Sequence, residues 1–210
     1  YGDHRDLHLS IRRQRQMCIR DRFVGDIGYD VCDYICQESE NLLNISNATL
    51  GEKEDNTVTK TIRSGKTGFI TSVDYDHRDL WDYTSNILWS YISEANRQSF
   101  GFNVSYLSNI QYTIYEPPGD HYDWHIDTFI DTPNAFQRKL SMTVQLSDGS
   151  EYEGGDFELR DGTANPLNQT ELKQKGTVLI FPSFLSHRVK PVTKGVRKTL
   201  VAWFEGKAFT

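Results

Sequence analysis

The chain has 210 residues and a formal net charge of −6. This length is typical of one domain with a substantial core, and the acidic balance does not favour nucleic-acid binding as the main role. The sequence contains neither an apolar run of membrane-spanning length nor a segment that resembles a signal peptide. We therefore expect a soluble, cytoplasmic protein that binds neither nucleic acid nor a membrane.

The first 22 residues differ from the rest of the chain. They are dense in arginine, fit neither a helix nor a strand pattern, and include a run, 15–22, that looks like a translated sequencing adapter. We expect residues 1–22 to be non-native or disordered and residues 23–210 to form a single domain. A basic arm that docks on a partner is the functional alternative for this segment.

The three cysteines, Cys18, Cys32 and Cys36, cannot all pair with one another. Cys32 and Cys36 have the spacing of neighbours on a helix rather than that of a metal-binding pair. We therefore expect reduced, structural thiols rather than a disulfide framework or a zinc site.

Two helices are predicted in the first half of the chain, over residues 30–43 and from Asp79, as the cap, to about residue 98. A polar loop over 44–56 and a short strand near 68–73 separate them. Apolar residues recur at helical spacing and would pack on a sheet. They are Val31, Tyr34, Ile35, Leu42 and Leu43 in the first helix, and Trp81, Ile87, Leu88, Tyr91, Ile92 and Ala95 in the second.

Strand patterns dominate the second half of the chain. Residues 105–115 and 139–146 alternate between apolar and polar side chains, and 177–181 form a short apolar run. If the apolar face of 139–146 meets the helices, its polar face lines a cavity. Residues 128–137 and 160–174 are predicted to be connections.

A histidine and a carboxylate, His125 and Asp127, are separated by one residue. If this segment is a strand, both side chains point to the same face. One imidazole and one carboxylate are two corners of the facial triad that holds non-haem Fe(II). A third ligand must come from elsewhere, and His187 follows the apolar run 177–181.

These residues belong to a larger pattern. It comprises Tyr-x-x-x-Gly-x-x-Tyr-x-x-His-x-Asp over 115–127, Glu-Gly-Gly-Asp-Phe over 153–157, and His187 with Arg197 ten residues later. In these motifs the chain resembles the Fe(II)- and 2-oxoglutarate-dependent oxygenases, and within them the prolyl 4-hydroxylase-like branch. The resemblance implies that Fe(II) binds to His125, Asp127 and His187, and that Arg197 and Tyr115 bind the distal carboxylate of 2-oxoglutarate.

The order of elements favours an α+β domain, mainly β, built around an antiparallel sheet that is closed or sandwiched. The resemblance makes this a double-stranded β-helix, or jelly roll, with the N-terminal helices packed on one sheet. In such a fold Asp127 and His187 can meet at one metal although they are far apart in the sequence.

Arg197 is a better candidate for the anion anchor than the neighbouring lysines. A buried carboxylate needs a fixed cation, and the planar guanidinium binds a carboxylate through two hydrogen bonds without losing its charge. On a strand, Arg197 shares a face with Thr199, Val201 and Trp203, whereas Lys198 points the other way. Some prolyl hydroxylases use lysine for this task, so Lys198 remains an alternative.

Two interpretations are open for the aromatic residues of the predicted site. Tyr122 and Trp203 are either core residues or, by the resemblance, cavity residues that bind the substrate, with Tyr122 close to the substrate and Trp203 near the metal. Phe157 would begin a strand whose side chain helps to wall the site. His121 and His77 are expected on the surface, and the glycosylation pattern that starts at Asn168 is interpreted as a coincidence.

The resemblance also implies an activity. It is the hydroxylation of an unactivated C–H bond with O2 and 2-oxoglutarate, releasing succinate and CO2, with ascorbate as a reductant. In the prolyl hydroxylase branch the position is C4 of a prolyl residue in a peptide or protein. The alternatives are the same chemistry on a free amino acid or other small molecule, a cupin-like metal enzyme, and a non-catalytic jelly-roll binding module.

Overall fold

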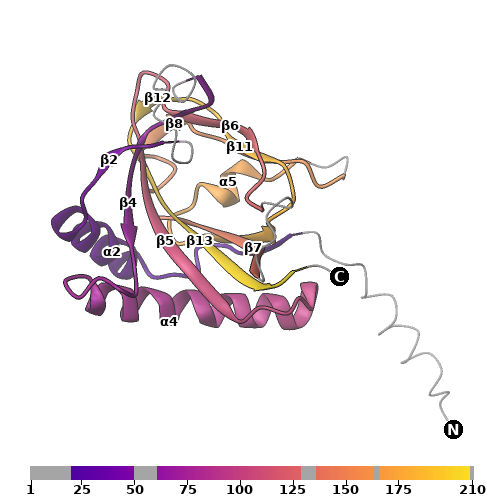
Figure 1. Ribbon diagram of the computed structural model, residues 1–210. Coiled ribbons are helices and arrows are strands. Elements are labelled where there is room, and N and C mark those ends of the chain that lie inside the picture. Colours follow the sequence, from indigo (N-terminus) through magenta and orange to yellow (C-terminus); the bar gives the residue numbers. More distant parts are fainter. Residues whose placement is uncertain (1–19, 50–60, 129–135, 163–165, 209–210) are drawn as a thin grey trace, which may run out of the picture.

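The computed structural model describes residues 20–49, 61–128, 136–162 and 166–208, and every structural statement below concerns these residues. They form a seven-stranded sheet, a four-stranded sheet and a two-stranded ribbon, and all strand pairs are antiparallel. The two long helices lie along one side of the large sheet, and the small sheet lies on the other side (Figure 1). The fold is therefore mainly β, with helices on one sheet, as predicted.

The seven-stranded sheet is the scaffold of the molecule. Its apolar residues alternate with polar ones, so one face packs against the helices and the other faces the small sheet. Each fully buried Leu or Ile contributes about 1.5–3 kcal/mol. In spatial order its strands are β1 (Asp21–Phe23), β10 (Val178–Pro182), β7 (Phe136–Gln145), β13 (Arg197–Lys207), β5 (Tyr106–Tyr115), β4 (Lys66–Ile70) and β2 (Ser46–Asn47).

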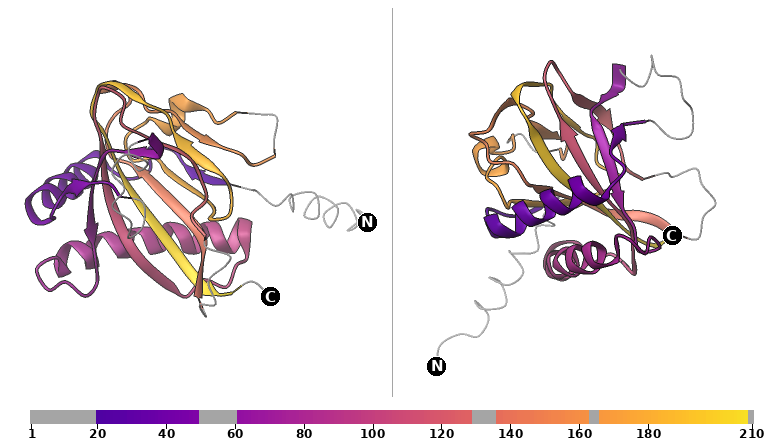
Figure 2. Two further views of the ribbon diagram at one scale, coloured as in Figure 1. Left: turned by 45° about the horizontal axis from the view of Figure 1, so that its top comes forward. Right: turned by 90° about the vertical axis from the view of Figure 1, so that its left-hand side faces the viewer.

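The four-stranded sheet is built from shorter pieces. In spatial order its strands are β3 (Arg63–Ser64), β6 (His121–His125), β11 (His187–Val189) and β9 (Phe157–Leu159), while β12 (Val192–Gly195) and β8 (Tyr152–Gly154) form the ribbon. Two further views show the strands of the small sheet across from those of the large sheet (Figure 2). Side-chain hydrogen bonds join the two sheets, from Arg63 on β3 to Gln111 on β5 and from Ser141 on β7 to Asp127 just beyond β6.

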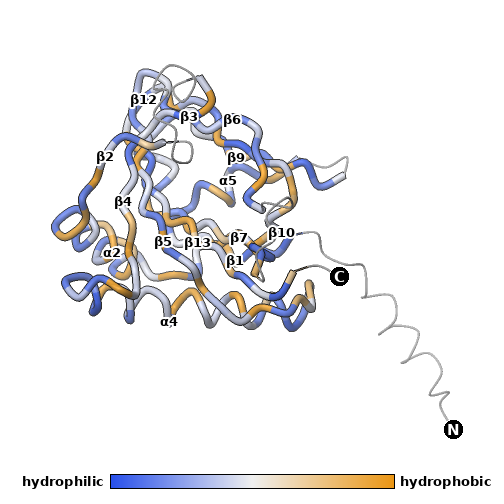
Figure 3. The backbone as a smooth tube through the Cα atoms, viewed as in Figure 1, coloured by the Kyte–Doolittle hydropathy of each residue, from blue (hydrophilic) through white to orange (hydrophobic). Residues whose placement is uncertain are grey.

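Helices α2 (Tyr29–Leu42) and α4 (Arg78–Ala95) correspond to the two predicted helices. Hydrophobic and hydrophilic residues alternate along α4 (Figure 3), and its fully buried positions include Leu88, Ile92 and Ala95. A short helix, α5 (Gln169–Leu172), lies within the predicted connection 160–174. Among the described residues, no helix combines the length and the apolar character needed to cross a membrane.

Several details of the helices differ from the prediction. The N-cap of α4 is His77 rather than Asp79, which lies in the first turn, and Asn96–Phe100 form a π-helical turn after the helix. His77 is half-buried rather than exposed because its ring contacts the Leu42 carbonyl. In α2 the buried face consists of Cys32, Ile35 and Ser39, whereas Tyr34 and Leu42 are exposed.

The start of the domain also differs from the predicted boundary. Strand β1 begins at Asp21 and pairs with β10, so the end of the segment 1–22 belongs to the large sheet. Residues 1–19, which include most of that segment and Cys18, lie outside the described residues. Cys32 and Cys36 are free thiols on α2, as predicted, and burial raises the pKa of the Cys32 thiol to about 11.

Candidate active site

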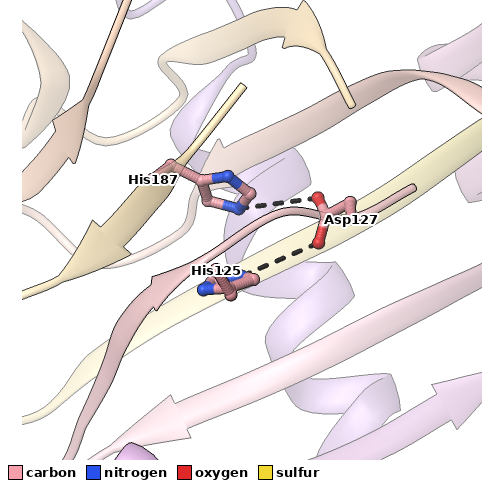
Figure 4. A group of neighbouring side chains, drawn as sticks. All are labelled: His125, Asp127 and His187. Atoms are coloured by element: carbon pink, nitrogen blue, oxygen red, sulfur yellow. Dashed lines mark ion pairs between the residues drawn. The ribbon is translucent and has the colours of Figure 1, made fainter. Parts of the chain in front are cut away.

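The predicted triad comes together at the end of the small sheet. His125 is the last residue of β6 and pairs in register with His187, the first residue of β11. Asp127 lies just beyond β6 rather than within a strand, but its carboxylate still turns toward both rings (Figure 4). The three ligand atoms all lie within 4.8 Å of one another, so the residues can share a single ion.

Backbone contacts orient both imidazoles. Nδ1 of His125 lies 2.8 Å from the carbonyl oxygen of Asp123, and Nδ1 of His187 lies 3.0 Å from that of Leu185. A protonated Nδ1 donates to each carbonyl, which leaves the lone pair of Nε2 facing the centre. The Nε2 atoms lie 3.7 Å (His125) and 3.5 Å (His187) from the two carboxylate oxygens of Asp127.

The charge states suit a metal site. Burial lowers the pKa of His125 to about 4, an effect that His187 adds to, so this imidazole is neutral near pH 7 and can donate its lone pair. Burial alone would raise the pKa of Asp127, but His187, His125 and the Ser141 hydroxyl outweigh it and lower the pKa. A neutral imidazole and an ionised carboxylate are donors of the kind that bind Fe(II) in a facial triad.

A pair of serines positions the carboxylate. The Ser141 hydroxyl on β7 donates to Oδ2 of Asp127 at 2.6 Å, and Ser183 lies 2.9 Å from the same hydroxyl. The backbone N–H of Asp127 also donates to the Ser183 carbonyl at 2.9 Å. Ser141 lies on the polar face predicted for 139–146, but the alternation alone did not identify a contact with Asp127.

The triad opens into a cavity of about 690 Å³ between the two sheets. Strand β13 contributes the face that strand parity predicted, namely Arg197, Thr199, Val201 and Trp203. Every predicted site residue lines this cavity: His125, Asp127, His187, Arg197, Tyr115, Tyr122 and Trp203. The structure therefore brings the seven residues together in one cavity, and their roles in binding stay predictions.

Arg197 is a buried cation without an acidic partner. It is 4% exposed, no described carboxylate forms an ion pair with it, and its Nε has no hydrogen-bond partner. Lys198 instead pairs with Glu40 on the opposite face of β13. A buried guanidinium is costly unless an anion compensates its charge, so this environment fits a ligand carboxylate.

Tyr115 and Gly155 complete the surroundings of Arg197. Tyr115 pairs with Arg197 across the sheet, its ring centroid lies 5.5 Å from the guanidinium carbon, and burial raises the pKa of its hydroxyl, which therefore remains a donor. Gly155, in the Glu-Gly-Gly-Asp-Phe motif, has a φ of +63°, and a Cβ there would lie 2.9 Å from Cδ of Arg197. Glycine at this position thus allows the backbone to approach the Arg197 side chain closely.

The aromatic residues face the cavity as the resemblance implied. The Tyr122 ring stacks on His125 with centroids 3.5 Å apart and an interplanar angle of 12°, and Phe157 stacks on His187 at 5.6 Å. The guanidinium of Arg138 lies 4.0 Å from the Trp203 ring centroid. Arg138 and Arg63 also line the cavity, but no motif in the sequence singled them out.

The remaining candidates lie elsewhere. His121 is on β6, where Nδ1 contacts the Gly119 carbonyl, and it is half-buried rather than on the surface but does not join the triad. Asn168 caps α5 by accepting a hydrogen bond from the Thr170 N–H at 3.1 Å. This capping role gives a structural reason for an asparagine in the glycosylation pattern.

Comparison with known proteins relates this site to a family. Residues 110–205 match the model of the 2OG-Fe(II) oxygenase superfamily, which implies Fe(II), 2-oxoglutarate and O2. A PKHD-type hydroxylase of Synechococcus sp. (strain CC9902) is 38% identical over 94 residues, which are 41% of this chain and 37% of that protein. One of Alteromonas mediterranea is 33% identical over 89 residues, 40% of this chain and 38% of that protein. The chain thus spans less than two fifths of the length of these curated relatives.

Solved structures show the same fold. A Trichoplax adhaerens prolyl hydroxylase in complex with a hypoxia inducible factor peptide fragment has a TM-score of 0.70 at 18% identity, covering 97% of this chain and 93% of that one. A Pseudomonas putida prolyl-4-hydroxylase has a TM-score of 0.63 at 20% identity, covering 90% and 94%. The family match confirms the predicted resemblance to the Fe(II)- and 2-oxoglutarate-dependent oxygenases, and these solved structures share the predicted jelly-roll fold.

Proposed function

We propose that this protein is an Fe(II)- and 2-oxoglutarate-dependent dioxygenase that hydroxylates C4 of a prolyl residue in a peptide or protein. The observation that carries the proposal is the arrangement of two complementary sites in one cavity. A triad with its lone pairs facing inward lies in the same cavity as a buried arginine that has no acidic partner among the described residues.

The residues would divide the work as follows. His125, Asp127 and His187 would hold Fe(II), while Arg197 and Tyr115 would bind the distal carboxylate of 2-oxoglutarate. Bound Fe(II) supplies the chemistry that couples decarboxylation of 2-oxoglutarate to transfer of one oxygen atom from O2 to the substrate. The walls of the cavity, which include Phe157, would exclude water and orient the two ligands.

The choice of a prolyl substrate rests on the relatives. The Trichoplax adhaerens and Pseudomonas putida proteins are prolyl hydroxylases, the first in complex with a peptide fragment. The cavity also includes Tyr122 and Trp203 beside the proposed metal ligands. These aromatic rings suit an apolar ring on a peptide chain. A free amino acid or another small molecule is the alternative substrate for the same chemistry.

The proposal can be tested by measuring succinate release from 2-oxoglutarate. The protein would be purified without oxygen, loaded with Fe(II) and ascorbate, and assayed in air with and without a proline-rich peptide. We expect the peptide to stimulate succinate release and to gain the mass of one oxygen atom. Turnover without any peptide effect would contradict the prolyl substrate, and a protein that binds neither iron nor 2-oxoglutarate would contradict the proposed chemistry.

A further inference from the structure

Arg63 contributes a further cation to the same cavity, besides Arg197 and Arg138. It lies on β3, the edge strand of the small sheet, in register with Tyr122. Nη2 donates to Oε1 of Gln111 at 3.1 Å, and Nη1 donates to the carbonyl of Thr49 at 3.3 Å. Both arginine and glutamine line the cavity, so this contact joins the small sheet to the large one.

The guanidinium of Arg63 is the outer layer of a stack that ends at the metal ligands. It lies 4.6 Å from the centroid of the Tyr122 ring, and that ring lies 3.5 Å from the ring of His125. A planar guanidinium stacks well on an aromatic face, and its edge remains available for hydrogen bonds. The cation is therefore held one aromatic ring away from the proposed iron site.

Gln111 fixes the position of Arg63 from the opposite side. Its side chain is buried, and its Nε2 donates to Oγ1 of Thr113 at 2.7 Å. This hydrogen bond sets the amide orientation and directs Oε1 toward the guanidinium. The arginine thus has a defined orientation in the protein before any ligand binds.

The charges in the cavity leave Arg63 without compensation. With the proposed ligands bound, the positive charges of Fe(II) and Arg197 cancel the negative charges of Asp127 and 2-oxoglutarate. Arg138 has Glu205 at 3.9 Å. In the described part of the chain, no carboxylate forms an ion pair with Arg63, and its buried Nε has no hydrogen-bond partner. A half-buried cation with an unused donor favours an anionic ligand.

We propose that Arg63 is a specificity-determining residue that binds a carboxylate of the substrate, so that the protein prefers a peptide with an acidic group close to the oxidised residue. This inference rests on the proposed function, because it assumes that a peptide occupies the cavity above the iron. The carboxylate belongs either to an aspartate or glutamate side chain or to the C-terminus of the peptide. Both sources present the same planar anion to the guanidinium.

The test compares the binding of matched peptides to the protein loaded with Mn(II) and 2-oxoglutarate. One peptide carries glutamate beside proline and has blocked ends, the second carries glutamine instead, and the third carries glutamine with a free C-terminal carboxylate. We expect at least one anionic peptide to bind about tenfold more tightly than the blocked glutamine peptide, as one charge-assisted contact would produce. The stronger of the two anionic peptides identifies the source of the carboxylate.

The variant Arg63→Gln tests whether Arg63 causes the preference for anionic peptides. We expect the affinity ratio between the anionic and neutral peptides to fall to about one, whereas the control Arg97→Gln, at a guanidinium 70% exposed and remote from the cavity, should keep it. Binding of 2-oxoglutarate and the melting temperature report whether each variant is folded. Equal affinities in the unmodified protein, a preference that survives Arg63→Gln, or no binding of any peptide would overturn the inference. Failure of the protein to bind Mn(II) and 2-oxoglutarate would instead overturn the proposed function.

Discussion

The two sheets line one cavity but are built differently. In the large sheet, strands of up to 11 residues are covered by α2 and α4 and hold most of the apolar core. In the small sheet the strands have two to five residues, and the proposed metal ligands lie at or just beyond their ends. The long strands thus provide stability and Arg197, the proposed anion anchor, whereas the short strands and their ends provide the proposed metal ligands.

This difference shows how the fold separates stability from chemistry. Residues at strand ends and in loops can change without removing much buried apolar surface, because the helices cover the other sheet. Contacts such as those of Ser141 with Asp127 and of Gln111 with Arg63 then hold the small sheet in register with the large one. Each variant below affects one sheet or the connection between them.

Asp127→Ala, beside the small sheet, should have the largest effect on function. The variant removes the charged proposed ligand. Loss of a residue that only contacts a metal ligand typically weakens metal binding 10- to 100-fold, so we expect the affinity for Co(II) to fall by more than about 100-fold here. We also expect succinate release to disappear. Calorimetry and the succinate assay measure these two quantities. The control Asp123→Asn, at an exposed side chain close to His125, should retain both, and turnover by Asp127→Ala would remove the triad assignment.

Leu88→Ala, on α4, should lower the stability of the fold without changing the proposed metal site. Leu88 is 1% exposed in the core against the large sheet, and its truncation should lower the free energy of unfolding by about 2–5 kcal/mol. Denaturant unfolding measures this loss, and the exposed Ser90→Ala serves as the control. Below the unfolding transition, Co(II) affinity should remain at its original value. A parallel loss of metal affinity would show that the two sheets are not separable.

Arg197→Met, on the large sheet, should weaken 2-oxoglutarate binding without changing the affinity for the metal. Loss of the charge-assisted hydrogen bonds should weaken 2-oxoglutarate binding roughly 100-fold, which is about 2.7 kcal/mol. Lys198→Met is the matched control, because this neighbour faces Glu40 on the opposite side of β13. If the lysine variant lost 2-oxoglutarate binding instead, Lys198 would be the anchor.

Ser141→Ala should have the smallest effect of the four. Its hydroxyl on the large sheet orients the Asp127 carboxylate, and loss of such an outer contact typically weakens metal binding by about tenfold or somewhat more. Ser141→Thr retains a hydroxyl and should restore most of the affinity for Co(II). An unchanged affinity in Ser141→Ala would show that the contact with Asp127 does not position this ligand.

The sequence predicted the long elements well because their patterns repeat. Alternation over 105–115 and 139–146 identified the core faces of β5 and β7, and parity along β13 placed Arg197 in the cavity and Lys198 outside it. Strand β3 has only two residues, too short for any periodicity, so the position of Arg63 could not be inferred. Arg63 reaches the cavity because β3 pairs with β6, and a local sequence pattern does not predict which strands pair.

Other parts of the site depend on neighbours that are distant in the sequence. Ser141 is one of several polar residues on β7, and only the fold shows that it contacts Asp127. The helix cap at His77 escaped prediction because Asp79 fits the usual preference, while His77 is held by the Leu42 carbonyl from α2. The resemblance to the family selected seven residues, and all of them line one cavity in the structure. Their roles in binding remain predictions.

In the proposed site one ligand, 2-oxoglutarate, binds to the triad metal and to Arg197 at the same time. The most direct test is to measure the affinity for 2-oxoglutarate with and without Mn(II), and the affinity for Mn(II) with and without 2-oxoglutarate. We predict that each ligand tightens the binding of the other by the same factor, as thermodynamic linkage requires. If Mn(II) and 2-oxoglutarate bound independently of each other, the ligand could not bridge the two sheets.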